Sequence, residues 1–293
     1  MKIGFLGTGI MGSHMARRLA AAGASVRAWN RSATKLEALV AHGVTRVATP
    51  SAALDGADVA IVMLSNGPVC DAVLFDADES ERIPADALAP GTTLVVMSSI
   101  PVETARAQAA RVSGRGVRYV DAPVSGGEPG ARDGTLAIMA GGEADAVRDI
   151  AQTLAPLGRV THLGPAGSGQ LAKLANQIIV GGTLVAIAEA LELVRRGGAD
   201  PAAVREAWMG GFADSKVLRV LGERMVSGDF APGSPAAYQL KDMRTAEAFA
   251  RSLGVRLEVF ESVIALFQAV ADRGEGDRDV SIVAREVSRR AAA

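Results

Sequence analysis

Short apolar runs alternate with amphipathic segments over the first half of the chain. The runs predict strands at Lys2–Leu6, Ser25–Trp29, Val59–Met63, Thr93–Met97 and Arg118–Asp121, with two shorter strands at Leu136–Ala140 and Val160–His162. Segments in which the apolar residues have helical spacing lie between most of these strands. Strands that alternate with helices are typical of a mostly parallel sheet covered by helices.

The pattern changes after Gly164, where helical spacing continues and no further strand is predicted. Glycine pairs and Pro201 separate the helical segments. The predicted helices are Gln170–Arg195, Pro201–Gly210, Lys216–Met225, Tyr238–Ser252 and Leu257–Asp272, and the residues Arg289–Ala293 are expected to be frayed. The sequence therefore predicts an α/β domain over residues 1–163, followed by an all-α domain over residues 164–293.

The chain begins with a glycine turn between a strand and a helix. Gly7, Gly9 and Gly12 have the spacing GxGxxG. Gly7 permits a tight turn, Gly9 lets the backbone approach a pyrophosphate, and Gly12 lets the helix pack on the strand. The helix N-terminus also offers free N–H groups to phosphates. We predict a Rossmann-like dinucleotide-binding domain with Gly7, Gly9, Ile10, Met11 and Gly12 at the cofactor; the alternative is a glycine turn that binds no ligand.

The end of the second predicted strand bears on the choice of cofactor. NAD-specific sheets carry Asp or Glu near this position, whereas this chain has Asn30, Arg31 and Ser32, with Lys35 one turn later. Arginine forms charge-assisted hydrogen bonds with a 2′-phosphate, which an acidic side chain would repel. We predict that Asn30, Arg31 and Ser32 contact the cofactor and that NADP is preferred. NAD stays the alternative, because Arg31 can also be a solvated residue at the start of a loop.

The composition describes a protein with a sizeable core and no excess of charge. Of its 293 residues, 49% are hydrophobic and 22% are charged, and the net charge of −1 gives no reason to expect binding to nucleic acid or a membrane. The apolar stretch Ile178–Ala188 is shorter than the roughly 20 residues of a membrane span, and is predicted as a buried helix. The single cysteine, Cys70, excludes an intrachain disulfide and fits the cytoplasm, where we expect the protein to reside. The three histidines are scattered, so no metal is expected.

Lys173 is the clearest candidate for acid–base chemistry. At about 100° per residue, Gly169, Lys173 and Asn176 share one face of a predicted helix that is otherwise apolar. Burying Lys173 and Asn176 without partners is costly, and Gly169 would leave room beside them for a ligand. Reduction of a carbonyl needs a proton at the developing alkoxide, and we expect a partly desolvated cleft to lower the pKa of Lys173 toward useful values. The alternative is a lysine that extends along the helix to solvent.

Two further stretches carry groups suited to a small acidic substrate. Ser125, Gly126 and Gly127 follow a predicted strand, and their hydroxyl and N–H groups suit a carboxylate. Lys241, followed by Asp242, places a second lysine in the helical domain. Taken alone, the first stretch is explained by a turn and the second by a solvated cluster of charges.

Together these motifs resemble those of the β-hydroxyacid dehydrogenases, and the resemblance covers nearly the whole chain. The signatures occur in order: GxGxMG at Gly7–Gly12, DAPVSGG at Asp121–Gly127, GxGxxxKxxN at Gly167–Asn176, and the pair Lys241 and Asp242. The resemblance implies an NAD(P)-dependent enzyme that interconverts a small β-hydroxy acid and its semialdehyde or keto acid. It also implies a Rossmann-like domain followed by a helical domain, and assembly into homodimers or homotetramers. Phe212–Ser215 and Gln239–Asp242 are more similar to the branch that reduces tartronate semialdehyde or glyoxylate than to the 3-hydroxyisobutyrate branch.

The resemblance also implies roles for single residues. Lys173 is similar to the catalytic lysine of the family, Asn176 to its supporting asparagine, and Ser125–Gly127 to the loop that binds the substrate carboxylate. The cofactor would be contacted by Leu64, Ser65 and Ser99, and near the nicotinamide by Lys241. The chain departs from the family pattern in two places: Gln177 stands where a second asparagine is frequent, and the loop with Ser99 is one residue shorter.

Two other classes of protein stay open at this stage. An imine reductase would share both domains but typically lacks a lysine at the position of Lys173. A non-catalytic cofactor-binding module would keep the glycine turn, but the pair Lys173 and Asn176 argues against it. Among substrates, 3-hydroxyisobutyrate, glyoxylate and succinic semialdehyde are alternatives to tartronate semialdehyde.

Overall fold

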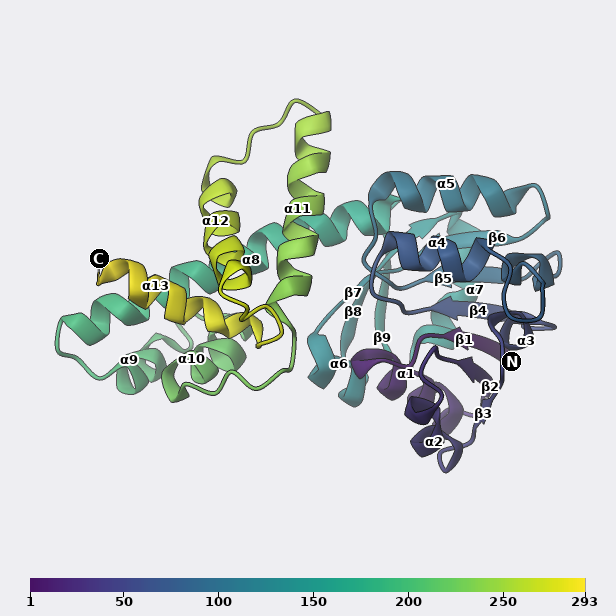
Figure 1. Cartoon of the computed structure of the whole chain (residues 1–293), viewed down its shortest axis with the longest axis horizontal. Helices are drawn as coiled ribbons and strands as arrows, with labels where there is room; N and C mark the ends of the chain where they lie inside the picture. Colours follow the sequence, from purple (N-terminus) through teal and green to yellow (C-terminus); the bar gives the residue numbers. More distant parts are fainter. Residues whose placement is uncertain (293) are drawn as a thin grey trace. The chain divides into compact units, whose positions relative to one another are not determined.

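The computed structural model describes residues 1–292 and divides into two compact units (Figure 1). The first unit is Met1–Lys173, and the second begins at Leu174. The division falls within helix α8 (Ser168–Arg196), so the first unit includes the start of that helix.

The first unit is built on a sheet with the strand order β3-β2-β1-β4-β5-β6-β8-β7, with β9 paired to β8. Strands β1 to β6 are parallel, whereas β8 is antiparallel to β6 and β7. The order 3-2-1-4-5-6 is that of a doubly wound Rossmann sheet, which confirms the predicted α/β fold. The strands are β1 (Lys2–Leu6), β2 (Ser25–Trp29), β3 (Val44–Arg46), β4 (Val59–Val62), β5 (Thr93–Val96), β6 (Arg118–Asp121), β7 (Val124–Ser125), β8 (Leu136–Gly142) and β9 (Gly158–His162).

Helices cover both faces of this sheet. Successive residues of a strand point to opposite sides, and the strands carry apolar residues on both sides, so each face needs a cover. On β1, Ile3 and Phe5 join one apolar cluster and Leu6 joins the other. The first cluster is completed by α1 (Ile10–Ala21), α2 (Thr34–Val40), α6 (Gly127–Asp133) and α7 (Ala144–Leu154). The second is completed by α3 (Pro50–Leu54), α4 (Gly67–Phe75), the short turn η1 (Pro84–Ala87) and α5 (Val102–Ser113). Figure 1 shows α4 and α5 on one side of the strands and α1 and α2 on the other.

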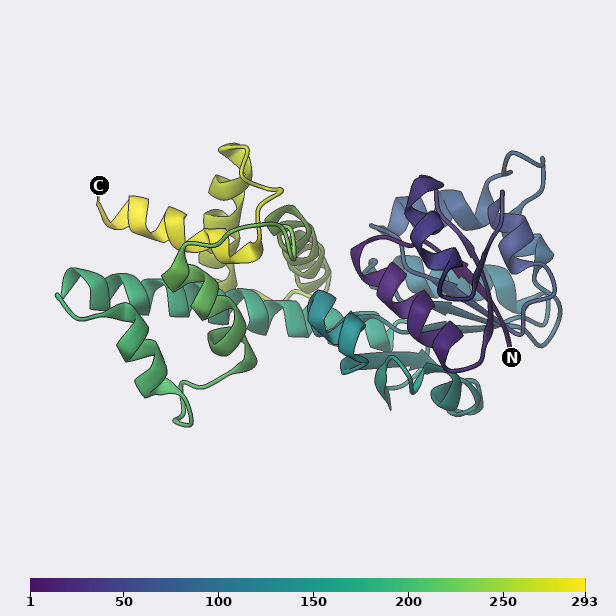
Figure 2. The ribbon, with the colours of Figure 1, turned by 90° about the horizontal axis from the view of Figure 1, so that it is seen from below.

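The second unit is helical in the part of the chain that the structure describes. Its buried residues include Leu184 of α8, Met243 of α11 (Ala236–Ser252) and Phe267 of α12 (Glu258–Asp272). Helices α11 and α12 pack against each other and lie side by side in Figure 1. Figure 2 shows these helices turned by 90°. After α8 come α9 (Pro201–Trp208), the π-helical turn η2 (Leu218–Gly222), α10 (Glu223–Ser227), α11 (Ala236–Ser252), α12 (Glu258–Asp272), the turn η3 (Val280–Ile282) and α13 (Val283–Ala291).

For the helical part, one prediction was confirmed and one was wrong. The segment Lys216–Met225 is helical without a break, with the π-helical turn η2 continuing directly into α10. The C-terminal residues from Arg289 were expected to be frayed, but Arg289 lies in α13 and donates to Glu275 at 2.8 Å. Ion pairs therefore hold the last turn of α13, whereas Ala293 lies outside the described residues.

Helix α8 is long and apolar enough, by length and composition alone, to cross a membrane. The core helix of a soluble protein passes the same test. In the structure Leu184, Ala188 and Leu191 are buried, as the predicted buried helix requires, while Ile179 and Leu193 are 69% and 74% exposed. The helix thus has a buried face that forms the core of the second unit and an apolar face that stays open.

Candidate active site

The glycine turn after β1 has the conformation expected of a dinucleotide-binding turn. Gly7 has φ +99°, and a Cβ at this position would collide with the carbonyl oxygen of Met63. A Cβ at Gly12 would collide with the carbonyl oxygen of Gly7, so α1 packs closely on the turn. A Cβ at Gly9 would meet nothing within 4 Å, and the first turn of α1 contains no acidic residue. The open space at Gly9 and the free N–H groups of α1 fit a pyrophosphate.

Asn30 has a structural task at the end of β2. Its Oδ1 accepts a hydrogen bond from the backbone N–H of Thr8 at 3.0 Å, and its Nδ2 donates to the carbonyl oxygen of Ser32 at 3.0 Å. The Asn30 amide therefore ties the end of β2 to the glycine turn. Arg31 and Ser32, the next two residues, are exposed.

The loops after β4 and β5 are joined by a residue that the sequence did not single out. Gln170 of α8 is 1% exposed; its Nε2 donates to the carbonyl oxygen of Ser98 at 2.8 Å, and its Oε1 accepts from the N–H of Ile100 at 3.1 Å. Ser98 in turn accepts a hydrogen bond from the N–H of Leu64 through Oγ at 2.7 Å. These bonds fix the backbone around the predicted residues Leu64, Ser65 and Ser99.

The second residue missed from the sequence is Asp121, at the carboxyl end of β6. Its carboxylate is fully buried and accepts two backbone hydrogen bonds, from the N–H groups of Gly167 and Gln170, both at 2.7 Å. Burial raises the pKa of the Asp121 carboxyl above its ordinary value, although these backbone donors act in the opposite direction. Asp121 thus satisfies N–H groups at the start of α8 as an N-cap residue would, but from a neighbouring strand.

The reason given for Gly169 was wrong. We expected the missing side chain to leave room for a ligand. In the structure, a Cβ at Gly169 would collide with the carbonyl oxygens of Met139 and Asp121. Gly169 therefore lets α8 pack closely against the backbone of the sheet.

Lys173 lies one turn after Gly169 and Gln170 on α8. Its side chain is only 8% exposed, so it does not extend to solvent as the alternative interpretation required. A buried lysine needs polar partners, because transfer of a charge from water is costly. The helix that carries Lys173 is fixed at its start by Asp121 and Gln170, which places the lysine on a rigid support.

Ser125, Gly126 and Gly127 occupy a constrained backbone between β6 and α6. Ser125 belongs to β7 and pairs with Ala137 of β8. Gly126 and Gly127 have φ of 140° and 63°, which side chains with a Cβ rarely adopt. Each of the three residues is partly exposed, so this loop is accessible from solvent.

In the second unit, the half-buried Asn176 and Lys241 lie at the two ends of a network of buried polar side chains. Asn176 Nδ2 donates to Gln177 Oε1, and Gln177 Nε2 donates to Gln239 Oε1 and to Asp242 Oδ2, all at 2.9 Å. Lys241 Nζ pairs with Asp242 Oδ1 at 2.8 Å. The sequence had identified Gln177 only as a departure from the family pattern. In the structure, Gln177 connects Asn176 to Gln239 and Asp242.

The predicted residues thus fall into two groups. The first group follows the carboxyl ends of strands of the first unit, where ligands bind to sheets of this kind. It consists of the glycine turn, Asn30–Ser32, Leu64, Ser65, Ser99 and Ser125–Gly127. Lys173 belongs to the same unit, whereas Asn176 and Lys241 belong to the second. Within residues 1–292, no three His, Cys, Asp or Glu side chains are grouped so that they could hold a metal ion.

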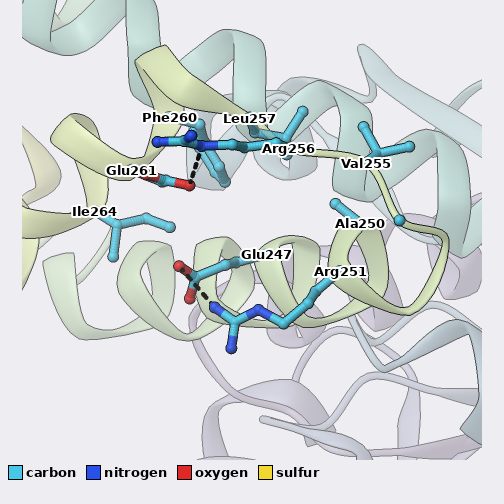
Figure 3. A pocket seen from close by; sticks show the side chains of 10 residues that line it. Glu247, Ala250, Arg251, Val255, Arg256, Leu257, Phe260, Glu261 and Ile264 are labelled. Atoms are coloured by element: carbon cyan, nitrogen blue, oxygen red, sulfur yellow. Dashed lines mark ion pairs between the residues drawn. The ribbon is translucent and has the colours of Figure 1, made fainter.

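A separate pocket of about 260 Å³ lies in the second unit between α11 and α12 (Figure 3). Its charged side chains pair with one another: Arg251 with Glu247, and Arg256 with Glu261, both at 3.5 Å. The lining includes none of the predicted site residues. This pocket is therefore distinct from the candidate active site.

Two family models match almost the whole chain. The first, described as the NAD binding domain of 6-phosphogluconate dehydrogenase, matches residues 2–164. The second, described as the NAD-binding of NADP-dependent 3-hydroxyisobutyrate dehydrogenase, matches residues 167–287. The 2-hydroxy-3-oxopropionate reductase of Escherichia coli (strain K12) is 40% identical over 96% of this chain and 95% of that protein. The chain belongs to the β-hydroxyacid dehydrogenase family.

This β-hydroxyacid dehydrogenase has further relatives with other substrates in their names. Glyoxylate/succinic semialdehyde reductase 1 of Arabidopsis thaliana is 30% identical over 98% of both chains. The solved structure of the 3-hydroxyisobutyrate dehydrogenase of Mycobacterium tuberculosis with L-serine is 30% identical, with a TM-score of 0.85 over 97% of this chain and 98% of that chain. The enzyme is therefore an NAD(P)-dependent oxidoreductase that interconverts a β-hydroxy acid and its semialdehyde or keto acid, and not a non-catalytic module.

Proposed function

We propose that the enzyme reduces 2-hydroxy-3-oxopropionate (tartronate semialdehyde) with NADPH. The observation that carries this proposal is the 40% identity to the Escherichia coli reductase of that name, which extends over 96% of the chain. The buried Lys173 on a helix anchored by Asp121 and Gln170 supports a reductase that uses a lysine as its acid.

In the proposed mechanism the chain holds the substrate and moves one proton. The Ser125 hydroxyl and the N–H groups of the following glycines bind the substrate carboxylate. When bound, the nicotinamide cofactor supplies the hydride to the carbonyl carbon. Lys173 Nζ donates a proton to the carbonyl oxygen, which becomes the new hydroxyl, and accepts that proton in the reverse direction. Asn176 orients the substrate for Lys173, and Lys241 would contact the cofactor near the nicotinamide, as the family motif implies.

The cofactor would be held by the glycine turn and by the end of β2. Gly7, Gly9, Ile10, Met11 and Gly12 support the pyrophosphate, and Leu64, Ser65 and Ser99 contact the remainder of the dinucleotide. The exposed guanidinium of Arg31 suits the 2′-phosphate of NADP, and the chain has no acidic residue at Asn30–Ser32 to repel it. NAD is the alternative cofactor, and no metal takes part in the proposed reaction.

The proposed reduction of tartronate semialdehyde has two alternatives that the relatives support. One is oxidation of 3-hydroxyisobutyrate, and the other is reduction of glyoxylate or succinic semialdehyde. These substrates differ by few atoms, and one methylene in a pocket changes the free energy of binding by only about 1–3 kcal/mol. A direct comparison of substrates is therefore required.

A second copy of the chain is the proposed partner. One face of α8 is apolar apart from the exposed Glu189, and each of its apolar residues is exposed or half-buried: Ala175, Ile179, Gly182, Ala186 and Leu193. Exposed apolar surface of this kind marks contacts between proteins. We infer that this face of α8, here called the α8 stripe, contributes to a homodimer or homotetramer in the cytoplasm.

The test of the function is a panel of substrates assayed with both cofactors. It contains tartronate semialdehyde, glyoxylate, succinic semialdehyde, methylmalonate semialdehyde, L-serine and L-threonate. We expect the highest kcat/KM for tartronate semialdehyde with NADPH. A higher kcat/KM for any other member of the panel would overturn the proposed substrate. Activity on cyclic imines alone would overturn the proposed reaction.

The role of Lys173 is tested by Lys173→Ala. Loss of the proton donor should lower kcat by about 10²- to 10⁴-fold while NADPH still binds. Lys216→Ala, which removes an exposed lysine of the second unit, is the matched control and should leave kcat unchanged. Turnover of Lys173→Ala close to that of the wild type would refute the proposed acid.

A further inference from the structure

In the buried network around Gln177, the donor and the acceptor of each hydrogen bond are fixed, because one member of the network can only accept hydrogen bonds. Asp242 is 8% exposed and pairs with Lys241 Nζ, and a carboxylate has no hydrogen to donate. Gln177 must therefore turn its Nε2 toward Asp242, which it does at 2.9 Å. The same Nε2 donates its other hydrogen to Gln239 Oε1 at 2.9 Å.

The orientation of the Gln177 amide in turn determines the orientation of the Asn176 amide. With Nε2 facing Asp242 and Gln239, the oxygen Oε1 of Gln177 is on the other side of the amide. Asn176 meets this oxygen with its Nδ2 at 2.9 Å. The oxygen of the Asn176 amide is consequently directed away from Gln177, where it offers an acceptor to a hydroxyl or an ammonium group.

We propose that Asp242 is a positioning residue which, through Gln177, fixes the orientation of the Asn176 amide. The proposal rests on the role of Asn176 at the substrate in the proposed function. Burial strengthens the effect, since Gln177 and Gln239 are 7% and 5% exposed and water cannot replace a lost partner at low cost. Lys241 supports the same orientation, because its ammonium pairs with the other carboxylate oxygen of Asp242.

The length of the side chain at residue 177 allows it to contact residues on both α8 and α11. Glutamine has one methylene more than the asparagine that is frequent at this position in the family. The longer side chain lets an amide that starts on α8 contact Gln239 and Asp242 on α11 while it still accepts from its neighbour Asn176. Gln177 therefore couples Asn176 to the pair Lys241 and Asp242.

A pair of substitutions tests the direction of the network. Gln177→Glu places a second carboxyl group against Asp242. When both groups are ionised, which a high assay pH favours, the pair repels and Asn176 is displaced. Displacement of a positioning group lowers kcat by up to about 100-fold. Asp242→Asn removes the acceptor-only anchor and should also lower kcat. In the double variant, the amide introduced at position 242 can donate to the carboxylate introduced at position 177. That carboxylate still accepts from Asn176, so the original orientation returns.

The expected result is therefore a rescue. The double variant should turn over faster than Gln177→Glu alone. KM for NADPH should stay within about twofold of the wild type in Gln177→Glu, which keeps the pair Lys241 and Asp242. Independent structural damage would instead make the double variant slower than either single variant, which would overturn the proposal. If Gln177→Glu does not fold, Asp242→Asn alone decides, because a wild-type kcat in that variant would also overturn it.

Two further measurements separate this inference from the proposed function. The matched control is Gln268→Glu with Asp272→Asn, since Gln268 Nε2 donates to Asp272 Oδ1 at 2.9 Å on α12, outside the network. These variants should keep the wild-type kcat. Thermal unfolding of the same proteins needs no substrate: the midpoint should fall in Gln177→Glu and recover in the double variant, even if tartronate semialdehyde is not the substrate.

Discussion

At the end of β2, two neighbouring side chains have different tasks. The Asn30 amide is occupied by Thr8 and Ser32, so it shapes the glycine turn. Arg31 is exposed and directly follows Asn30 in the chain. In the proposed function, the side chain that distinguishes the two cofactors is therefore Arg31.

Arg31→Ala should weaken the use of NADPH much more than that of NADH. A hydrogen bond between charged groups contributes about 1.5–3 kcal/mol, which corresponds to an increase of about 10- to 100-fold in KM for NADPH. KM for NADH should change by less than about twofold, because NADH has no 2′-phosphate. Initial rates at a fixed concentration of substrate measure both values.

Arg148→Ala is the control for this prediction. Arg148 lies on α7, its side chain is 73% exposed, and its nearest charged partner is Asp149 at 4.0 Å. Removing Arg148 lowers the net charge by the same amount but should change neither KM. Equal effects of Arg31→Ala on both cofactors would contradict the assignment of Arg31 to the 2′-phosphate.

At the scale of elements, the sequence predicted the sheet and the helix with Lys173 because both depend on local patterns. Strands β1, β2 and β6 have the predicted bounds, since β2 alternates regularly and β1 and β6 each contain a short buried run that begins after a charged residue. Strand β3 was missed because only Val44 of its three residues is buried, which leaves no periodicity to detect. Asp121 was missed as an anchor because its partners Gly167 and Gln170 lie 46 and 49 residues further on.

The anchor of α8 leads to a prediction about stability and pH. Asp121→Asn can accept only one of the two backbone hydrogen bonds, so one buried N–H loses its partner at a cost of about 1–3 kcal/mol. The pKa of Asp121 is raised in the folded protein. The stability that Asp121 contributes is therefore full below the ordinary pKa of aspartate and declines as the pH rises through the raised value. Asp121→Asn should accordingly destabilise the protein more at about pH 4 than at about pH 7.

Urea denaturation at the two pH values measures this difference. Asp58→Asn is the control, because Asp58 is exposed and accepts one backbone hydrogen bond from Lys2 at 2.7 Å. Its effect should be small at both pH values. A larger destabilisation by Asp121→Asn at pH 7 than at pH 4 would show that the carboxylate is favoured by the folded state, contrary to its burial.

At the scale of the whole molecule, α8 has two faces with different tasks. One face buries Leu184, Ala188 and Leu191 in the second unit, and the other carries the α8 stripe. A stable contact between proteins buries about 1,200–2,000 Å² in total, and one stripe can contribute the apolar centre of such a contact. The same helix would then serve the reaction at its start and assembly along its length.

Ile179→Glu should therefore weaken the proposed assembly. A charge in the apolar centre of an interface must be desolvated without a partner, which costs several kcal/mol per copy, or about a thousandfold or more in the association constant. We expect the wild-type protein to have a multiple of the 30.0 kDa chain mass by light scattering, and Ile179→Glu to shift toward one chain. Val259→Glu changes an equally exposed residue on α12, 78% exposed against 69% for Ile179, and should keep the wild-type mass. A wild-type protein with the mass of one chain would refute the role of the α8 stripe. If Ile179→Glu kept the mass of the wild-type assembly, the contact between copies would have to involve another face.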